Sequence, residues 1–130
     1  MMVCVIDTHA LVWYLTDDKR LGKQAAELLD RPDTRIVVPV IVLAELKYLH
    51  RRSRISLSFS AVLTIIGADE RCSVYPVNEE VVDLLPLDLD IHDAIICATA
   101  LVCRRAIGED TVVLTKDQAI TDSGLVSTVW

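Results

Sequence analysis

Long apolar stretches are missing from this sequence of 130 residues. None of its hydrophobic runs approaches the roughly 20 residues that a helix needs to span a bilayer. The first residues also lack the basic start and the small-residue cleavage site of a secretory signal peptide. These absences argue against a membrane protein, and we expect the protein to be cytoplasmic.

The spacing of the cysteines matches no metal-binding pattern. The four cysteines form neither a C-x-x-C pair nor the paired spacing that a structural zinc site requires. We expect all of them to be reduced thiols in the core: Cys4, Cys72, Cys97 and Cys103.

Basic residues are outnumbered by acidic ones. Lys and Arg number 13 against 19 Asp and Glu, which gives a formal net charge of −6. A protein that coats nucleic acid by general electrostatics would carry the opposite sign. Any role on nucleic acid must therefore rest on a local basic patch or on bound metal ions.

What the sequence does have is a high apolar content, 52%, arranged in short strands that alternate with helices. Runs rich in β-branched residues predict strands at 3–6, 35–38, 72–77, 111–114 and 127–130. Apolar spacing predicts helices at 10–15, 21–29, 40–52, 61–66, 78–85 and 90–105, and a short helical turn after residue 117. Strands joined by helical crossovers form a parallel sheet with helices on both faces. We expect a single α/β domain over residues 1–130.

Several helix ends carry recognisable signals. The polar segment 16–18 is placed to cap the second helix, and Pro39 suits the first turn of the third. Asn78 predicts a cap at the start of its helix. Gly108 predicts the end of the long helix that begins near Asp90.

Three acidic residues are placed at one edge of this predicted sheet. Asp7 closes the first strand, and Asp117 follows the fourth. Asp93 lies in the opening turn of the helix that leads into the fourth strand, and such a helix starts at the carboxyl edge of the strands. Loops at that edge surround the crevice in which open α/β sheets bind ligands. We therefore expect the three carboxylates to converge.

Glu45 is the fourth acidic residue of interest, because its helical neighbours are apolar. The residues one turn away are Ile41, Val42, Tyr48 and Leu49, so neither Lys nor Arg stands on that face. Desolvating an unpaired carboxylate costs several kcal/mol, so a compensating cation is expected. A metal ion supplies it most simply, and an arginine distant in sequence is the alternative.

Four carboxylates in one pocket repel one another unless cations neutralise them or their pKa values rise. Oxygen ligands without a cluster of His and Cys suit Mg²⁺ or Mn²⁺ rather than zinc. Such ions support phosphodiester hydrolysis, in which one activates a water and another stabilises the leaving oxygen. Because water is the nucleophile, no Ser, Cys or His is required.

The segments around these acids also resemble a known family. The order and spacing of a PIN domain are found in VIDTHALVWYL with Asp7, VLAEL with Glu45, DIHDAIICATAL with Asp93 and VVLTKD with Asp117. Over nearly all of its length the chain resembles a VapC-type ribonuclease toxin of a prokaryotic toxin–antitoxin pair.

The resemblance implies a three-layer α/β/α sandwich with a central parallel sheet. It implies an endoribonuclease that binds Mg²⁺ or Mn²⁺ and cleaves RNA, often structured RNA such as transfer RNA. It assigns both metal binding and catalysis to Asp7, Glu45, Asp93 and Asp117. The implied partners are a second copy, forming a homodimer, and a small inhibitory antitoxin of the VapB type.

Three positions depart from the family pattern. His9 stands where many relatives have Asn, Pro39 where many have Ser or Thr, and Lys116 replaces a frequent Arg. His9 also argues against a haloacid-dehalogenase-like phosphatase, which needs a second Asp two residues after the first. The main functional alternative is a catalytically inactive PIN-like module that binds RNA or protein.

Structural roles are open for several of these residues. Asp7 and Asp90 are suited to cap helices, and Asp117 to a turn. His9 and His92 stand beside site acids, where they either orient ligands or are ordinary polar residues.

Several basic and aromatic side chains also allow either a structural or a functional role. Lys47, His50, Arg51 and Arg54 form a helical stripe, which is either a solvated face or a phosphate-steering patch. Arg104, Arg105 and Lys116 are candidate members of that patch. Trp13 and Tyr14 are expected in the core or in an interface.

Overall fold

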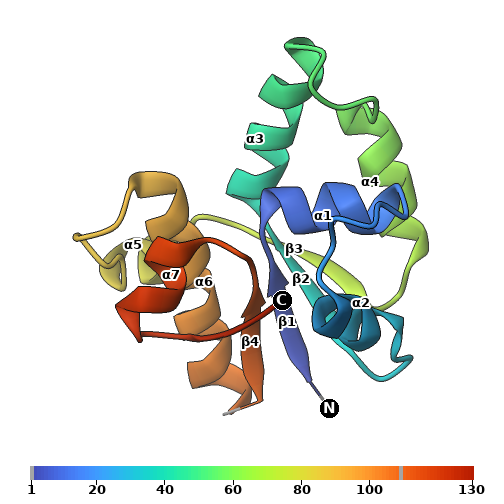
Figure 1. Cartoon of the computed structure of the whole chain (residues 1–130). Helices are drawn as coiled ribbons and strands as arrows, with labels where there is room; N and C mark the ends of the chain where they lie inside the picture. The colour runs from blue at the N-terminus through green and yellow to red at the C-terminus, as the bar shows by residue number, and fades with distance from the viewer. Residues whose placement is uncertain (1, 109) are drawn as a thin grey trace.

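Five parallel strands form one sheet in the computed structural model, which describes residues 2–108 and 110–130 (Figure 1). The strands are β1 (Val3–Ile6), β2 (Arg35–Pro39), β3 (Cys72–Tyr75), β4 (Thr111–Leu114) and β5 (Ser127–Val129). They lie in the order β3-β2-β1-β4-β5, and every neighbouring pair is parallel. The predicted parallel sheet is therefore confirmed.

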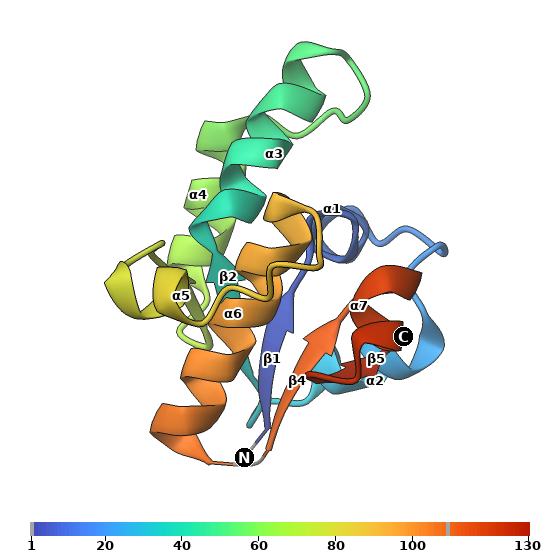
Figure 2. The same cartoon turned by 90° about the vertical axis from the view of Figure 1, so that its left-hand side faces the viewer.

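Helices cover both faces of this sheet. They are α1 (Thr8–Leu15), α2 (Lys23–Asp30), α3 (Val40–Arg51), α4 (Phe59–Ala68), α5 (Glu79–Asp83), α6 (Ile91–Ile107) and α7 (Gln118–Ser123). The chain moves outward from β1 to β3 and then crosses back to β4, so right-handed crossovers place α1 and α2 on one face and α6 on the other. Figures 1 and 2 show α5, α6 and α7 on the side opposite α2, which completes the three layers.

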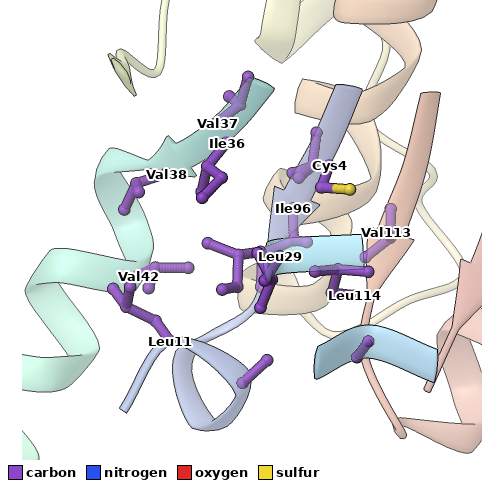
Figure 3. Packing of buried hydrophobic residues seen from close by; sticks show 14 of the residues in the cluster. Cys4, Leu11, Leu29, Ile36, Val37, Val38, Val42, Ile96, Val113 and Leu114 are labelled. Carbon is purple, nitrogen blue, oxygen red and sulfur yellow. The ribbon is translucent and has the colours of Figure 1, made fainter. Parts of the chain in front are cut away.

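The central strand β1 organises the core. Its residues are at most 1% exposed, and Cys4 pairs with Ile36 of β2 on one side and with Val112 of β4 on the other. Figure 3 shows Leu11 of α1 and Leu29 of α2 among the side chains that pack together around these strands. A continuous apolar strand is what a parallel sheet covered on both faces requires.

A smaller cluster joins α5 to α6 on the opposite face. Val81 of α5 packs with Ile95, Ala98 and Val102 of α6, which recur at the spacing of one helix face. The predicted periodicity of the long helix is thereby confirmed. This packing fixes the position of α6, whose first turn lies at the carboxyl edge of the strands.

The predicted cap of the second helix is wrong. Gly22, and none of the three residues of segment 16–18, occupies the N-cap of α2, which starts at Lys23. Asp18 instead binds Arg20, whose Nη2 lies 2.8 Å from Asp18 Oδ2. The Asp18 side chain, which lies in the segment predicted to cap α2, therefore forms an ion pair two residues along the chain.

Other boundaries moved by a few residues for identifiable reasons. Helix α1 begins at Thr8 because Asp7 caps it, and α4 begins at Phe59 because the Ser58 hydroxyl accepts from its first turn. Strand β3 ends at Tyr75, directly before Pro76, which cannot donate to the ladder. Asn78 caps α5, as predicted.

The four cysteines are free thiols. Three are buried, but Cys72 is only half-buried, so the expectation of a core thiol is wrong for this one. Its strand, β3, lies at the edge of the sheet and is less covered than the central strands. Burial raises the pKa of the Cys4, Cys72 and Cys97 thiols to about 11, which keeps them protonated.

Gly22 is expected to tolerate no side chain, because a Cβ there would overlap the backbone and the indole of Trp130. We expect Gly22→Ala to lower the free energy of unfolding by about 1–3 kcal/mol, which is typical of overpacking. Gly67→Ala in α4 is the matched control, since nothing lies within 4 Å of its Cβ position. Urea unfolding should show that this control is neutral or stabilising. Equal effects of both substitutions would contradict the close approach at Gly22.

Candidate functional site

Four acidic side chains, far apart in sequence, line a single pocket at the carboxyl edge of the sheet. This pocket, the acidic pocket, encloses about 470 Å³. Its walls are Asp7, Thr8, His9, Glu45, Asp93, Ile96, Lys116, Asp117 and Gln118. The structure therefore brings together all four acids singled out from the sequence: Asp7, Glu45, Asp93 and Asp117. They come from the ends of β1 and β4 and from α3 and α6.

Asp7 has a structural role and also faces the acidic pocket. Its backbone N–H donates to Leu114 O at 3.2 Å, which ties the end of β1 to β4. Its carboxylate accepts from Ala10 N at 2.9 Å, so it caps α1. The predicted cap is confirmed. This capping hydrogen bond uses Oδ1 of Asp7, so Oδ2 remains available to other partners.

Asp117 repeats this arrangement one strand away. Its carboxylate accepts from Ile120 N at 3.0 Å and caps α7, while its own N–H donates to the Thr115 hydroxyl at 3.0 Å. The interpretation as a turn residue is replaced by that of a helix cap. Two short strands thus end in capping aspartates, and both carboxylates line the same pocket.

Glu45 is half-buried on α3, and no ion pair in the described part of the chain involves it. The distant arginine considered from the sequence is therefore not its partner. Burial raises the pKa of Glu45; the charge of His92 is the largest influence that lowers it, and the charge of Asp93 raises it further.

The pKa values of two other acids in the pocket, Asp7 and Asp93, are raised as well. The pKa of Asp7 is raised, chiefly by burial, against the hydroxyl of Thr115 and the amide of Ala10, which lower it. The pKa of Asp93 is also raised by burial, with contributions from the negative charges of Asp117, Asp90 and Asp7. The pKa values of these carboxylates are raised by burial and by one another, and none of the carboxylates forms an ion pair within the described residues.

The chemistry of the pocket suits a hard divalent cation. All candidate ligands are carboxylate oxygens, which Mg²⁺ and Mn²⁺ prefer. Among the described residues the buried Thr8 hydroxyl has no hydrogen-bond partner, yet it lies close enough to Glu45 to lower the pKa of that side chain. Within the described residues, no three acidic, His or Cys side chains are clustered closely enough to hold an ion by themselves. Mg²⁺ commonly takes one or two carboxylates and keeps several waters, so these residues fit such an ion.

Asp90 does not behave as the sequence suggested. It occupies the N-cap position of α6, but its side chain makes no capping hydrogen bond. The predicted side-chain cap is therefore wrong. Its charge instead raises the pKa of Asp93 nearby. The exposed His92 has the opposite influence, because its charge lowers the pKa of both Glu45 and Asp93.

The sequence did not predict the contact between Trp13 and Lys116, the lysine that lines the acidic pocket. Trp13 is in the core, as expected, with only 6% of its surface exposed. The Lys116 ammonium lies 4.7 Å from the centre of the Trp13 ring, and the His9 ring lies 5.4 Å from it. Thr115 and Gln118 were also missed. The pattern T-x-D at residues 115–117 was the available signal for Thr115.

The basic stripe is exposed along its whole length. Lys47 lies over the ring of Phe59 at 5.4 Å, whereas Arg54 lines a second pocket. Arg104 and Arg105 lie at the far end of α6, around a different cavity, so they do not join the acidic pocket. Lys116 is the basic side chain that lines it.

Comparisons with known proteins agree with this architecture. Residues 4–122 match the PIN domain family. No curated protein sequence matches the chain significantly.

Solved structures at low sequence identity share the fold. VapBC2 from Rickettsia felis, bound to a DNA fragment from its promoter, is 16% identical with a TM-score of 0.66, and 98% of each chain is covered. A toxin–antitoxin complex from Klebsiella pneumoniae is 20% identical with a TM-score of 0.64, and covers 98% of this chain and 96% of that one. A domain of a functionally unknown protein from Methanocaldococcus jannaschii is 16% identical with a TM-score of 0.55, at 100% and 91% coverage.

Proposed function

Because the chain belongs to the PIN domain family, we propose that it is a metal-dependent endoribonuclease that acts as the toxin of a toxin–antitoxin pair. Members of this family are typically nucleases. The observation that carries the proposal is the convergence on one pocket, at the edge of the sheet, of four carboxylates that form no ion pair within the described residues. We assign metal binding and catalysis to Asp7, Glu45, Asp93 and Asp117 within a single domain.

The carboxylates of the acidic pocket support this proposal, because they are suited to hold a cation that promotes hydrolysis of an RNA phosphodiester. A bound Mg²⁺ or Mn²⁺ would activate the attacking water and neutralise charge that develops on the phosphate. Asp7 and Asp117 are held rigidly, since each is fixed by its own capping hydrogen bond. Lys116 lines the pocket, and we assign it to attract the RNA phosphate. The Thr8 hydroxyl is available to donate to a water or to Glu45.

The direct test is an RNA cleavage assay with purified protein, using bulk transfer RNA as substrate. We expect cleavage with Mg²⁺ or Mn²⁺ and none with excess chelator. RNA binding without cleavage in either ion would overturn the nuclease and leave the alternative, a PIN-like binding module.

Metal binding is expected to stabilise the protein in a pH-dependent way. The raised pKa values of Asp7, Glu45 and Asp93 mean that the folded state holds these protons more tightly than the unfolded chain does. Without metal, the stability from these groups is present below the ordinary carboxyl pKa and is lost as pH rises through the raised values. Mn²⁺ needs ionised ligands, so its stabilisation should grow over the same range.

Thermal unfolding with Mn²⁺ and with chelator, at about pH 5 and about pH 8, measures this effect. At a hundredfold excess over the dissociation constant we expect about 2.7 kcal/mol of stabilisation at the higher pH, and less at the lower. A melting temperature that Mn²⁺ and Mg²⁺ leave unchanged at both pH values would contradict the assigned metal site.

The partners we propose are RNA, a small antitoxin and a second copy of this chain. Two of the structures that share the fold are toxin–antitoxin assemblies, which supports the antitoxin. Large apolar side chains are exposed near the start of α6 and on α3, among them Leu87, Ile91 and Tyr48, which a homodimer or an inhibitor would cover.

No helix in the described part of the chain is long and apolar enough for a membrane crossing. We propose that the protein acts on RNA in the cytoplasm.

A further inference from the structure

A second pocket of about 530 Å³ adjoins the acidic pocket, and His9 lines both. Its walls are His9, Val12, Trp13, Thr16, Asp18, Arg20, Leu49, Arg54, Ile55 and Ser56. We propose that this basic pocket binds the RNA strand next to the phosphodiester that is cleaved, with Arg54 as the main phosphate contact. The identity of the ligand rests on the proposed nuclease function.

The two pockets are connected through Trp13. Lys116, in the acidic pocket, lies 4.7 Å from the centre of the Trp13 ring, and Arg20, in the basic pocket, lies 4.9 Å from it. The His9 ring is also adjacent, at 5.4 Å. One indole therefore positions a cation in each pocket. Successive phosphates of one strand could contact first one pocket and then the other.

Trp13 itself is a positioning residue in this arrangement. Only 6% of its surface is exposed, so its ring has no free face on which a base could stack. The ring of Trp130 also packs edge-on against it, at 5.8 Å. The contact with RNA must therefore come from the charged groups that surround the indole.

Arg54 is the strongest candidate among those groups. Arg20 is largely neutralised, because its guanidinium makes two hydrogen bonds to the Asp18 carboxylate, at 3.1 and 2.8 Å. Arg54 is exposed and takes part in no ion pair within residues 2–108 and 110–130. It also continues the exposed basic stripe of α3, which lies on an otherwise acidic protein. A guanidinium in that position offers the paired donors that phosphate oxygens accept.

The rest of the basic pocket matches a nucleotide better than an isolated anion. Val12, Leu49 and Ile55 provide apolar surface, which a ribose or the face of a base would cover, while the hydroxyls of Thr16 and Ser56 are polar contacts. Contacts of this kind position a strand on its enzyme and carry little sequence information.

The test compares Arg54→Ala with Arg35→Ala, a control substitution that removes the same positive charge. Arg35 is exposed and begins β2, so it lies at the opposite edge of the sheet. Binding of fluorescein-labelled bulk transfer RNA is measured in chelator, so that no cleavage occurs, over a range of salt concentrations. Cleavage kinetics are then measured with Mn²⁺.

We expect Arg54→Ala to weaken binding by about tenfold to a hundredfold, as for one lost charge-assisted hydrogen bond, and to lower the salt slope by about one. The loss in cleavage should fall on KM more than on kcat. Arg35→Ala should leave both the binding and its salt slope as they are in the parent. A merely structural role of Arg54 would not change the salt slope.

The outcomes separate this proposal from the nuclease function. If the parent cleaves RNA and Arg54→Ala binds as tightly as Arg35→Ala, the basic pocket is overturned and the nuclease stands. If the parent binds RNA through Arg54 but does not cleave it, RNA binding by the basic pocket stands, while the nuclease and the position of the pocket beside a cleaved bond are overturned. If the parent neither binds nor cleaves RNA, both are overturned. Loss of binding to a protein partner alone in Arg54→Ala would assign the pocket to that partner instead.

Discussion

Replacement of Asp7 by asparagine is expected to reduce RNA cleavage by roughly a thousandfold and to keep the fold. Charge stabilisation by a metal is worth several kcal/mol, and about 1.4 kcal/mol corresponds to a factor of ten in rate. The fold survives because asparagine caps helices as well as aspartate does, so the hydrogen bond to Ala10 N is kept. In chelator the variant should be at least as stable as the parent, since a carboxyl with a raised pKa is removed.

The matched control for this prediction is Asp17→Asn, the same chemical change at the other end of α1. Asp17 is exposed and has a φ of 51°, a left-handed conformation that asparagine accepts readily. Its substitution should leave cleavage at the level of the parent. Single-turnover cleavage of bulk transfer RNA, with thermal unfolding of each variant, measures both properties. An Asp7→Asn protein that cuts RNA as fast as the parent would remove Asp7 from the catalytic centre.

Arg71→Ala is expected to lower the free energy of unfolding by about 2–4 kcal/mol, because loss of the half-buried guanidinium leaves several hydrogen-bond acceptors without a donor. The Arg71 guanidinium donates to Leu29 O at 2.6 Å and to Arg31 O at 2.9 Å. It also donates to the Tyr14 hydroxyl at 3.1 Å and to Asp69 at 2.9 Å. One side chain thus ties the start of β3 to the end of α2 and to α1.

Urea unfolding of Arg71→Ala measures the loss as a lower midpoint with an unchanged slope. Arg31→Ala is the control, because its ion pair with Asp33 is more than half exposed on both sides and should contribute little. Arg71→Lys should recover only part of the stability, since an ammonium cannot reproduce the planar fork of donors. Equal stability of Arg71→Ala and Arg31→Ala would show that the network is not maintained in solution.

The strands and the convergence of acids were predictable because both follow from short-range order. Four consecutive apolar residues before Asp7, and three apolar residues that follow Thr111 before Thr115, indicate buried strands. Parallel strands carry their following residues to one edge, so the positions of Asp7 and Asp117 follow from topology alone. Helix boundaries were less certain, since caps such as Ser58 and Gly22 depend on local hydrogen bonds that hydrophobic periodicity does not report.

Partners distant in sequence could not be predicted in the same way. Residues 13 and 116 meet only because β1 and β4 are neighbours in the sheet, and Arg71 reaches Leu29 across 42 residues of chain. Asp90 shows the reverse case, because a favourable sequence position did not produce the expected capping hydrogen bond. Side-chain rotamers and the packing of neighbouring elements decide such contacts.

The sequence by itself determined that this chain is an α/β protein whose acidic residues follow strands or open helices at one edge of a parallel sheet, because the periods of apolar residues and the order of the elements are local properties. Only the tertiary structure decided which charges surround those acids, that Glu45 lacks a cationic partner in the described chain, and that Trp13 links the acidic pocket to the basic pocket. The physical reason is that burial and electrostatic interaction depend on distance in space, which the chain sets only when it folds.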